Sequence, residues 1–325
     1  MIELFCILAV SYAFTYLSVP WFIPRLIKAG ITGKDMNKTN SQKIPEMGGF
    51  AIMAGFIVGI LITIGLSTSG MINANINLPI ILASLTTILI MSVIGIIDDL
   101  FLIRQHIKAI LPIFASLPLV AVSAGVSHMY FPMIGDIDFG ILYPLIIIPL
   151  AITGASNATN MLAGFNGLEA SLGGVMLATV GIASYLAGRT DAMILSFSML
   201  GALLAFLKYN WYPAKIFIGD IGTLAIGATV AVSVIIGNIE RIGIILILPF
   251  FLELYLKAKG RFNSQSWCEI KDEKLICPKR SEVFGLGRLI MYMTGGIKEA
   301  RLVTYIILIE SVFASIALTL PVVIK

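Results

Sequence analysis

The sequence predicts an all-α polytopic membrane protein with about ten transmembrane helices. Of its 325 residues, 58% are hydrophobic and only 12% are charged, with a mean hydropathy of +0.98. A soluble domain carries about 25% charged residues. The apolar residues also fall in runs of about 20, the length that a spanning helix needs. We expect a single domain over 1–325, because the chain has no low-complexity tract, fixed repeat or Gly/Ser linker.

Ten apolar segments qualify as spans. Continuous apolar runs favour helices over outer-membrane strands, which show a weaker alternation over about ten residues. The largest polar stretch, at about 258–301, follows the ninth segment and is predicted to be a large cytoplasmic loop. In order, the ten segments are roughly 2–24, 50–67, 79–97, 109–125, 141–158, 170–187, 192–208, 220–238, 242–257 and 302–324.

The basic residues predict the orientation. With ten spans, 19 of the 22 Lys and Arg residues fall on one side and only Arg189, Arg241 and Lys325 on the other. The positive-inside rule makes the first side cytoplasmic. Both termini should then lie outside, with the active site on the cytoplasmic face of the plasma membrane. Topology alone explains most of these cations, although a basic face also suits anionic head groups or phosphorylated substrates.

Two adjacent acids, Asp98 and Asp99, end the third segment. They repel each other and face the negative end of the helix dipole, so something cationic should offset them. The candidates are a metal ion, Lys108 or a bound substrate, and the alternative is an ordinary solvated helix end. Lys108 itself is either a phosphate ligand or an interfacial lysine that snorkels.

Three asparagines lie in the segment NATNMLAGFNGLE (157–169). Asn157 and Asn160 are three residues apart and would share one face of a helix, whereas Asn166-Gly167 signals a turn. Amides near a bilayer are costly, which favours function over structure. They coordinate a hard cation through oxygen, or read the edge of a base with paired donor and acceptor.

Asp220 opens the eighth segment directly after Gly219. An acid is favourable at a helix N-terminus, so capping alone explains it. A carboxylate at the mouth of a membrane helix is equally a ligand for Mg²⁺. Phe217 lies close by and could stack on a flat ring or make an ordinary apolar contact. Two further acids, Glu253 and Glu310, fall inside spans and are therefore functional candidates, although Glu310 has no evident partner.

Taken together, four motifs resemble the polyprenyl-phosphate N-acetylhexosamine-1-phosphate transferase family. Within that family the chain is most similar to the eukaryotic and archaeal branch that uses UDP-N-acetylglucosamine (UDP-GlcNAc) and dolichyl phosphate. The pointer to that branch is Ala163-Gly164, where bacterial members usually have Asp-Gly. In chain order the motifs are GKDMNKTNSQKIPE, DDL with Lys108, NATNMLAGFNGLE and NWYPAKIFIGD.

The resemblance implies roles for individual residues. Asn160 and Asp220 match the positions that hold Mg²⁺, or Mn²⁺ in its place. Asp98, Asp99 and Lys108 match the catalytic acids and the lysine beside the reacting phosphates. Phe217 and Asn166 match uracil contacts, and Lys43 and Glu46 match the polar loop before the second span. Asn157, from its own polar segment, is a further candidate for substrate binding.

The chain departs from the family pattern in its last cytoplasmic loop. Many members carry histidine or an Arg-His-Arg run there, whereas this chain has CPKR. Lys279 and Arg280 are therefore predicted to contact sugar or phosphate, in competition with Lys257, Lys259 and Arg261.

The implied reaction transfers a sugar 1-phosphate from a UDP-sugar to a polyprenyl or dolichyl phosphate, with release of UMP. The expected sugar 1-phosphate is GlcNAc 1-phosphate. The expected partners are these two substrates and the membrane; a homodimer is allowed, and no nucleic acid is expected. One alternative is a secondary transporter, but the polar groups cluster at one face and no inverted repeat is visible. The other is a membrane scaffold without catalysis.

Overall fold

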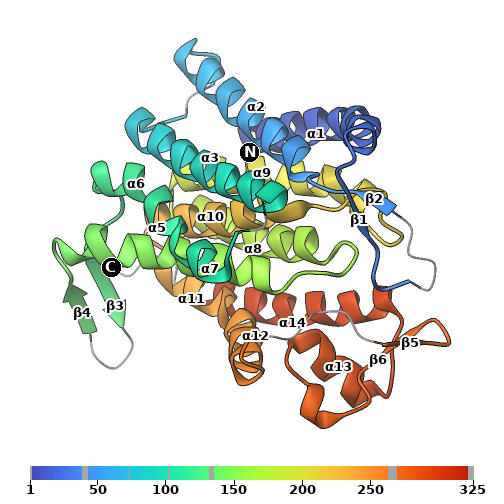
Figure 1. Ribbon diagram of the computed structural model, residues 1–325. Coiled ribbons are helices and arrows are strands. Elements are labelled where there is room, and N and C mark those ends of the chain that lie inside the picture. Colours follow the sequence, from blue (N-terminus) through green and yellow to red (C-terminus); the bar gives the residue numbers. More distant parts are fainter. Residues whose placement is uncertain are drawn as a thin grey trace.

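The computed structural model describes a helical protein and confirms this part of the predicted fold class. Its helices run roughly side by side and carry short hairpins at their ends (Figure 1). Among the described residues, seven helices are long and apolar enough to cross a membrane. The described residues are 2–38, 43–72, 74–101, 103–131, 135–262 and 269–320.

The seven long helices correspond to seven of the ten predicted spans. Most begin or end within a few residues of the predicted limits, because the apolar runs stop at charged or glycine-containing turns. They are α1 (Ile2–Lys28), α2 (Gly49–Thr68), α3 (Leu78–Phe101), α8 (Leu168–Leu186), α9 (Thr190–Asn210), α10 (Gly219–Gly237) and α14 (Glu299–Thr319).

The other three predicted spans are built from short or irregular helices. Each contains proline, which lacks the N–H that an uninterrupted helix uses and therefore tends to begin a new helical piece. Ten continuous spans thus stay a prediction. The segment 109–125 comprises α4 (Gln105–Ile110), α5 (Pro112–Ala115) and α6 (Leu117–Ala121); 141–158 comprises a π-helix η1 (Tyr143–Ile147) and α7 (Ile148–Met161); 242–257 comprises α11 (Glu240–Leu246) and α12 (Leu248–Lys259).

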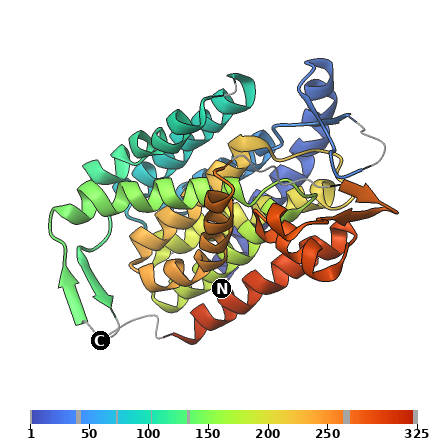
Figure 2. The same cartoon turned by 60° about the horizontal axis from the view of Figure 1, so that its bottom comes forward.

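Three antiparallel hairpins, which the sequence analysis did not predict, lie at the two ends of the helices. The pair β1 (Thr32–Lys34) and β2 (Lys43–Pro45) and the pair β5 (Glu269–Lys271) and β6 (Lys274–Ile276) share one end. The pair β3 (His128–Phe131) and β4 (Gly135–Asp138) lies at the opposite end (Figures 1 and 2).

The predicted loop 258–301 is in fact largely structured. It holds β5 and β6, a 3₁₀ turn η2 (Arg280–Glu282) and α13 (Leu286–Thr294), which packs on α14. Residues 263–268 lie outside the described part of the chain. The segment therefore forms a small lobe at the end that also carries β1 and β2 (Figure 2).

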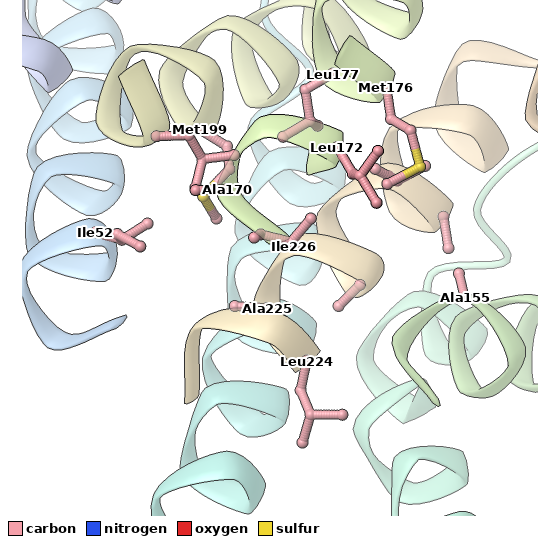
Figure 3. Close-up of a cluster of buried hydrophobic side chains, with 14 of the residues drawn as sticks. Ile52, Ala155, Ala170, Leu172, Met176, Leu177, Met199, Leu224, Ala225 and Ile226 are labelled. Atoms are coloured by element: carbon pink, nitrogen blue, oxygen red, sulfur yellow. The ribbon is translucent and has the colours of Figure 1, made fainter. Parts of the chain in front are cut away.

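Helix α10 is the centre of the fold, and 83% of its most apolar 18-residue stretch is buried inside the protein. It packs on α2, α3, α7, α8 and α9. Leu224, Ala225 and Ile226 of α10 lie among apolar side chains of these neighbours (Figure 3). A helix that is apolar on all sides is suited to this central position.

Two glycines allow close approach of the helices that carry the polar motifs. A Cβ at Gly95 of α3 would lie 2.5 Å from the Cα of Ile221, and one at Gly227 of α10 would lie 2.4 Å from the carbonyl oxygen of Ala155 in α7. Small residues of this kind let backbones pack closely in membrane helices. The ends of α3, α7 and α10 are thereby held together.

Candidate active site

Lys108 joins two of the predicted motifs. Its ammonium group forms ion pairs with the carboxylates of Asp98, at the end of α3, and Asp220, at the start of α10. Asp98 is buried, and its other oxygen accepts a hydrogen bond from the Ile103 N–H at 2.9 Å. The cation that should offset the Asp98 charge is therefore Lys108.

Asp99 is offset differently. Its two carboxylate oxygens accept hydrogen bonds from the backbone N–H groups of Asp220 at 2.8 Å and Ile221 at 3.2 Å. Asp99 thus caps the N-terminus of α10 from a separate helix, where the helix dipole favours an anion. The two adjacent acids consequently have different surroundings, Asp98 beside an ammonium group and Asp99 on backbone amides.

The turn before Asp220 requires glycine. Gly219 has φ +72°, a left-handed conformation that costs an L-residue free energy. A Cβ there would also lie 2.7 Å from Oδ2 of Asp99. The Gly-Asp pair that the sequence analysis singled out is therefore a geometric requirement for bringing Asp99 onto the start of α10.

Asn160 completes the cluster from the end of α7. With its amide nitrogen donating to Oδ1 of Asp220 at 3.0 Å and to Oγ1 of Thr223 at 3.1 Å, its oxygen accepts from Nζ of Lys108 at 2.7 Å. We assign this amide orientation because the reverse one sets acceptor against acceptor. Asp98, Asp99, Lys108, Asn160 and Asp220, which we call the acid–lysine cluster, are thus brought together by three helices and the α4 turn.

The donor set of this cluster fits a hard divalent cation. Carboxylate and amide oxygens are the ligands that Mg²⁺ takes, usually one or two carboxylates together with substrate phosphate oxygens. Within the described ranges, no three His, Cys, Asp or Glu side chains form a metal-binding group. Asp98, Asp220 and the Asn160 oxygen would therefore supply only part of a coordination shell.

The β1–β2 hairpin lies beside the cluster. The carbonyl of Pro45 accepts from the Phe217 N–H, and the Phe217 carbonyl accepts from the Gly48 N–H, each at 2.8 Å. Glu46 is partly buried, and that burial, together with the charge of Asp99, raises the pKa of its carboxyl. Glu46, which follows β2, and Phe217, which precedes α10, therefore flank the cluster. Lys43, the other predicted contact near β2, is exposed.

Asn166 lies at a buried junction of the loop after α7. Its oxygen accepts from the Ala214 N–H at 2.6 Å, and its amide nitrogen donates to Glu299 at 2.8 Å and to Asp35 at 3.2 Å. These bonds use both amide donors and one acceptor site. A base would have to be read by the remaining lone pair or by the neighbouring backbone.

Two acids of this junction were not predicted from the sequence. Asp35 is buried and pairs with Lys38 at 2.6 Å. Glu299 is buried at the start of α14 and also accepts from the Asn166 N–H at 2.7 Å. Asp35 lies in the quoted motif GKDMNK and was detectable, whereas Glu299 is 133 residues from its partner, and no local pattern identifies it.

Asn157, which lies about one turn before Asn160 on α7, lines an apolar cavity of about 510 Å³. Its amide donates to the Thr153 carbonyl at 2.9 Å, one turn back on α7. The cavity is walled by α7, α10, α11 and α12, and Tyr143 and Glu240 lie at its far end, near β3. Tyr143 donates to Glu240 at 2.5 Å there. The long, apolar cavity has the character of a site for a hydrocarbon chain.

Lys279 and Arg280 lie in the C-terminal lobe. Lys279 pairs with Glu282 of its own loop at 3.6 Å, with 71% of its side chain exposed, and Arg280 is exposed as well. No contact within the described part of the chain joins either residue to the acid–lysine cluster. Their sugar or phosphate contacts stay a prediction.

Lys257, a competing basic candidate, has a different position. It donates to the carbonyl of Met161, at the end of α7, and pairs with Glu253 at 3.2 Å. Glu253 in turn accepts from the Leu286 N–H of α13 at 2.5 Å. The cation therefore faces a helix C-terminus and the anion a helix N-terminus, as the helix dipoles favour.

Glu310, by contrast, lies deep in α14. It is buried, and neither of its carboxylate oxygens has a hydrogen-bond partner in the described part of the chain. Its sequence context offers no evident partner, and none is present among the described residues. It does not belong to the acid–lysine cluster.

Comparison with known proteins identifies the family. A model of glycosyl transferase family 4 matches residues 80–238. The chain is 36% identical over 315 residues to a Saccharolobus solfataricus protein provisionally named UDP-N-acetylglucosamine–dolichyl-phosphate N-acetylglucosaminephosphotransferase, with 96% of this chain and 94% of the relative covered.

Two further relatives come from other domains of life. The Schizosaccharomyces pombe UDP-N-acetylglucosamine–dolichyl-phosphate N-acetylglucosaminephosphotransferase is 29% identical, with 78% of this chain and 66% of the relative covered. The phospho-N-acetylmuramoyl-pentapeptide-transferase of Shouchella clausii is 30% identical, with 76% and 79% covered. The matched region contains the whole acid–lysine cluster, and the chain belongs to glycosyl transferase family 4.

Proposed function

We propose that this protein transfers GlcNAc 1-phosphate from UDP-GlcNAc to a dolichyl or related polyprenyl phosphate, forming a lipid-linked sugar diphosphate and releasing UMP. The observation that carries the proposal is the position of Lys108, between Asp98 and Asp220, near the end of an apolar cavity lined by Asn157. The names of the archaeal and yeast relatives support the choice of sugar and lipid.

In the proposed reaction, a phosphate oxygen of the lipid attacks the β-phosphorus of the nucleotide sugar. A new phosphorus–oxygen bond forms, the bond from that phosphorus to the bridging oxygen breaks, and the electron pair leaves with UMP. Such a transfer depends on alignment and charge neutralisation more than on covalent help from the protein. A lipid phosphate is already ionised at neutral pH, so Asp98 is assigned an orienting role.

Lys108 has a direct role in this scheme. Two anions must meet at the cluster, and a fixed ammonium group there screens their repulsion. Asp98, Asp220 and the Asn160 oxygen are the proposed ligands of Mg²⁺, which supplies further charge neutralisation when bound. Asp99 holds the Asp220 backbone in place and is a positioning residue.

The apolar cavity is the proposed place of the isoprenoid chain. Its walls are hydrocarbon over most of their area, and its lining on α7 includes Asn157 and the two residues that flank Asn160 of the cluster, Thr159 and Met161. The nucleotide would approach from the end that carries β1–β2 and β5–β6 (Figure 2). We place that end at the cytoplasmic face of the cell membrane, because most Lys and Arg residues belong to its loops.

The assay is release of UMP by the purified protein from UDP-GlcNAc, with dolichyl phosphate and Mg²⁺. We expect turnover that stops on addition of EDTA and returns with excess Mg²⁺. A panel of UDP-sugars should show preference for UDP-GlcNAc. Asp220→Asn should lose turnover while its thermal midpoint is retained. Unchanged activity in that variant, or UMP release that does not need the lipid, would refute the proposal.

A further inference from the structure

A second polar pocket lies in the C-terminal lobe, away from the acid–lysine cluster. It has a volume of about 210 Å³ and is lined by Lys274 of β6, Thr294 of α13, and Lys298, Arg301 and Tyr305 at the start of α14. Neither the proposed reaction nor the sequence motifs use these residues. Three cations around one small cavity make it a candidate anion site.

The charges of this pocket are largely uncompensated. No hydrogen bond or ion pair within the described ranges involves the side-chain cation of Lys274 or Arg301. Lys298 pairs with Glu273 at 3.4 Å, but the two side chains are 60% and 82% exposed. Exposed pairs of this kind are weak. Glu299, the nearest acid on α14, faces away and bonds to Asn166.

The face of α14 below the pocket is apolar. Arg301, Tyr305, Leu308, Val312 and Ile316 recur at intervals of four, three, four and four residues, which places them on one face of the helix. Tyr305 is 46% exposed, and the three aliphatic side chains are 47–57% exposed. One exposed stripe thus passes from a cation through an aromatic ring to hydrocarbon, the order found across a membrane interface.

We propose that this pocket binds the phosphate of an anionic membrane phospholipid whose acyl chains lie along the exposed stripe of α14. The stripe continues directly from Arg301 and Tyr305 of the pocket, so a lipid whose phosphate is held by the three cations would have its acyl chains beside hydrocarbon side chains, whereas a soluble phosphate would use the cations alone. Basic pockets beside transmembrane helices on the cytoplasmic side are suited to such head groups. The bound lipid would hold β6 against the start of α14, where Leu275 and Ile297 already form an isolated β-bridge.

The test uses the full-length protein in detergent, titrated with phosphatidylglycerol and followed by native mass spectrometry. Lys274→Gln/Lys298→Gln/Arg301→Gln should weaken phosphatidylglycerol binding about a hundredfold at low salt, since each interfacial cation contributes close to one decade or less. The effect should shrink at high ionic strength. Phosphatidylcholine should bind weakly to both proteins.

The matched control is Lys28→Gln/Lys34→Gln/Lys208→Gln, which removes three exposed cations outside the pocket. It should bind phosphatidylglycerol as the unaltered protein does. If the pocket variant folds poorly, Arg301→Gln alone should still show a severalfold loss. Equal loss in the pocket and control variants would overturn the site. Inorganic phosphate that binds as tightly as the lipid, or displaces it at equal concentration, would overturn the lipid assignment.

Discussion

Asp99 in α3 accepts the backbone N–H of Asp220 in α10 at 2.8 Å, although 121 residues separate them in the chain. This bond fixes the start of α10 against the end of α3, while the neighbouring Asp98 is left facing Lys108. Two adjacent acids thus divide into a structural residue and one that faces the site. That division leads to a direct comparison of the two acids.

Asp98→Asn and Asp99→Ala should fail in different ways. Asp98→Asn removes a charge from the cluster, and we expect loss of turnover with little change in thermal midpoint. Asp99→Ala removes a helix cap, which typically costs about 1 kcal/mol of stability, so its midpoint should fall. Asp99→Asn retains a cap acceptor and should recover most of the midpoint. Equal thermal midpoints for all three variants would contradict this division.

Lys108→Met should abolish most of the activity. It removes the cation between Asp98 and Asp220, and loss of one preorganised stabilising group typically lowers kcat by about 10²–10³-fold. Lys108→Arg retains the charge but changes its geometry, and should recover only part of the rate. Steady-state UMP release at saturating substrates measures the effect. A Met variant with undiminished kcat would exclude Lys108 from the reaction.

Glu46 should make stability depend on pH. Its folded-state pKa is raised by burial and by Asp99, so the folded protein binds a proton more tightly than the unfolded chain. The unfolding free energy should therefore decrease as pH rises from the ordinary glutamate pKa through the raised one. Glu46→Gln should match the unaltered protein at low pH and exceed its thermal midpoint at high pH. Parallel midpoint curves for the two proteins would contradict this.

Lys257→Met should destabilise the fold strongly. It leaves the buried Glu253 without its cation, a change that typically costs about 3–5 kcal/mol. Glu253→Gln/Lys257→Met removes the uncompensated charge and should recover part of the loss. A double-mutant cycle on thermal midpoints measures the coupling. Additive single effects would show that the two side chains do not stabilise each other.

Glu310→Leu should stabilise the protein or leave its stability unchanged. The buried acid has no hydrogen-bond partner among the described residues, so no interaction there compensates for its lost hydration. Turnover should persist, since Glu310 lies outside the acid–lysine cluster. This variant also addresses the transporter alternative, because an acid inside a membrane span is a functional candidate in a transporter. If the variant lost UMP release while its thermal midpoint stayed unchanged, Glu310 would be required for activity, which would contradict this prediction.

Much of this structure follows from local sequence. Apolar run length predicted the seven long helices, and the short polar motifs predicted which residues gather at one end. The structure of the three interrupted segments was harder to predict. A proline indicates where a helix breaks but not how the helical pieces on its two sides are oriented. Pro112 is the first residue of its helix, and Pro118 and Pro249 are each the second.

The remaining features depend on contacts between distant residues. Glu299 meets Asn166, and Glu253 meets Leu286, only after the helices have packed. Lys108 was one of three candidates to offset the Asp98-Asp99 charges, and only the packing of α3 and α10 brings Asp98 and Asp220 to it. No periodicity encodes such pairs.

The broken helices have one further consequence. Three acids of the acid–lysine cluster lie on the continuous helices α3 and α10, and Asn160 lies at the end of α7, whereas α11 and α12 line the apolar cavity and contribute no residue to the cluster. Substitutions in α11 and α12 can therefore change the shape of the apolar cavity without altering a residue of the ionic centre. The fold thus keeps part of the cavity wall on helices that can vary independently of the charged residues.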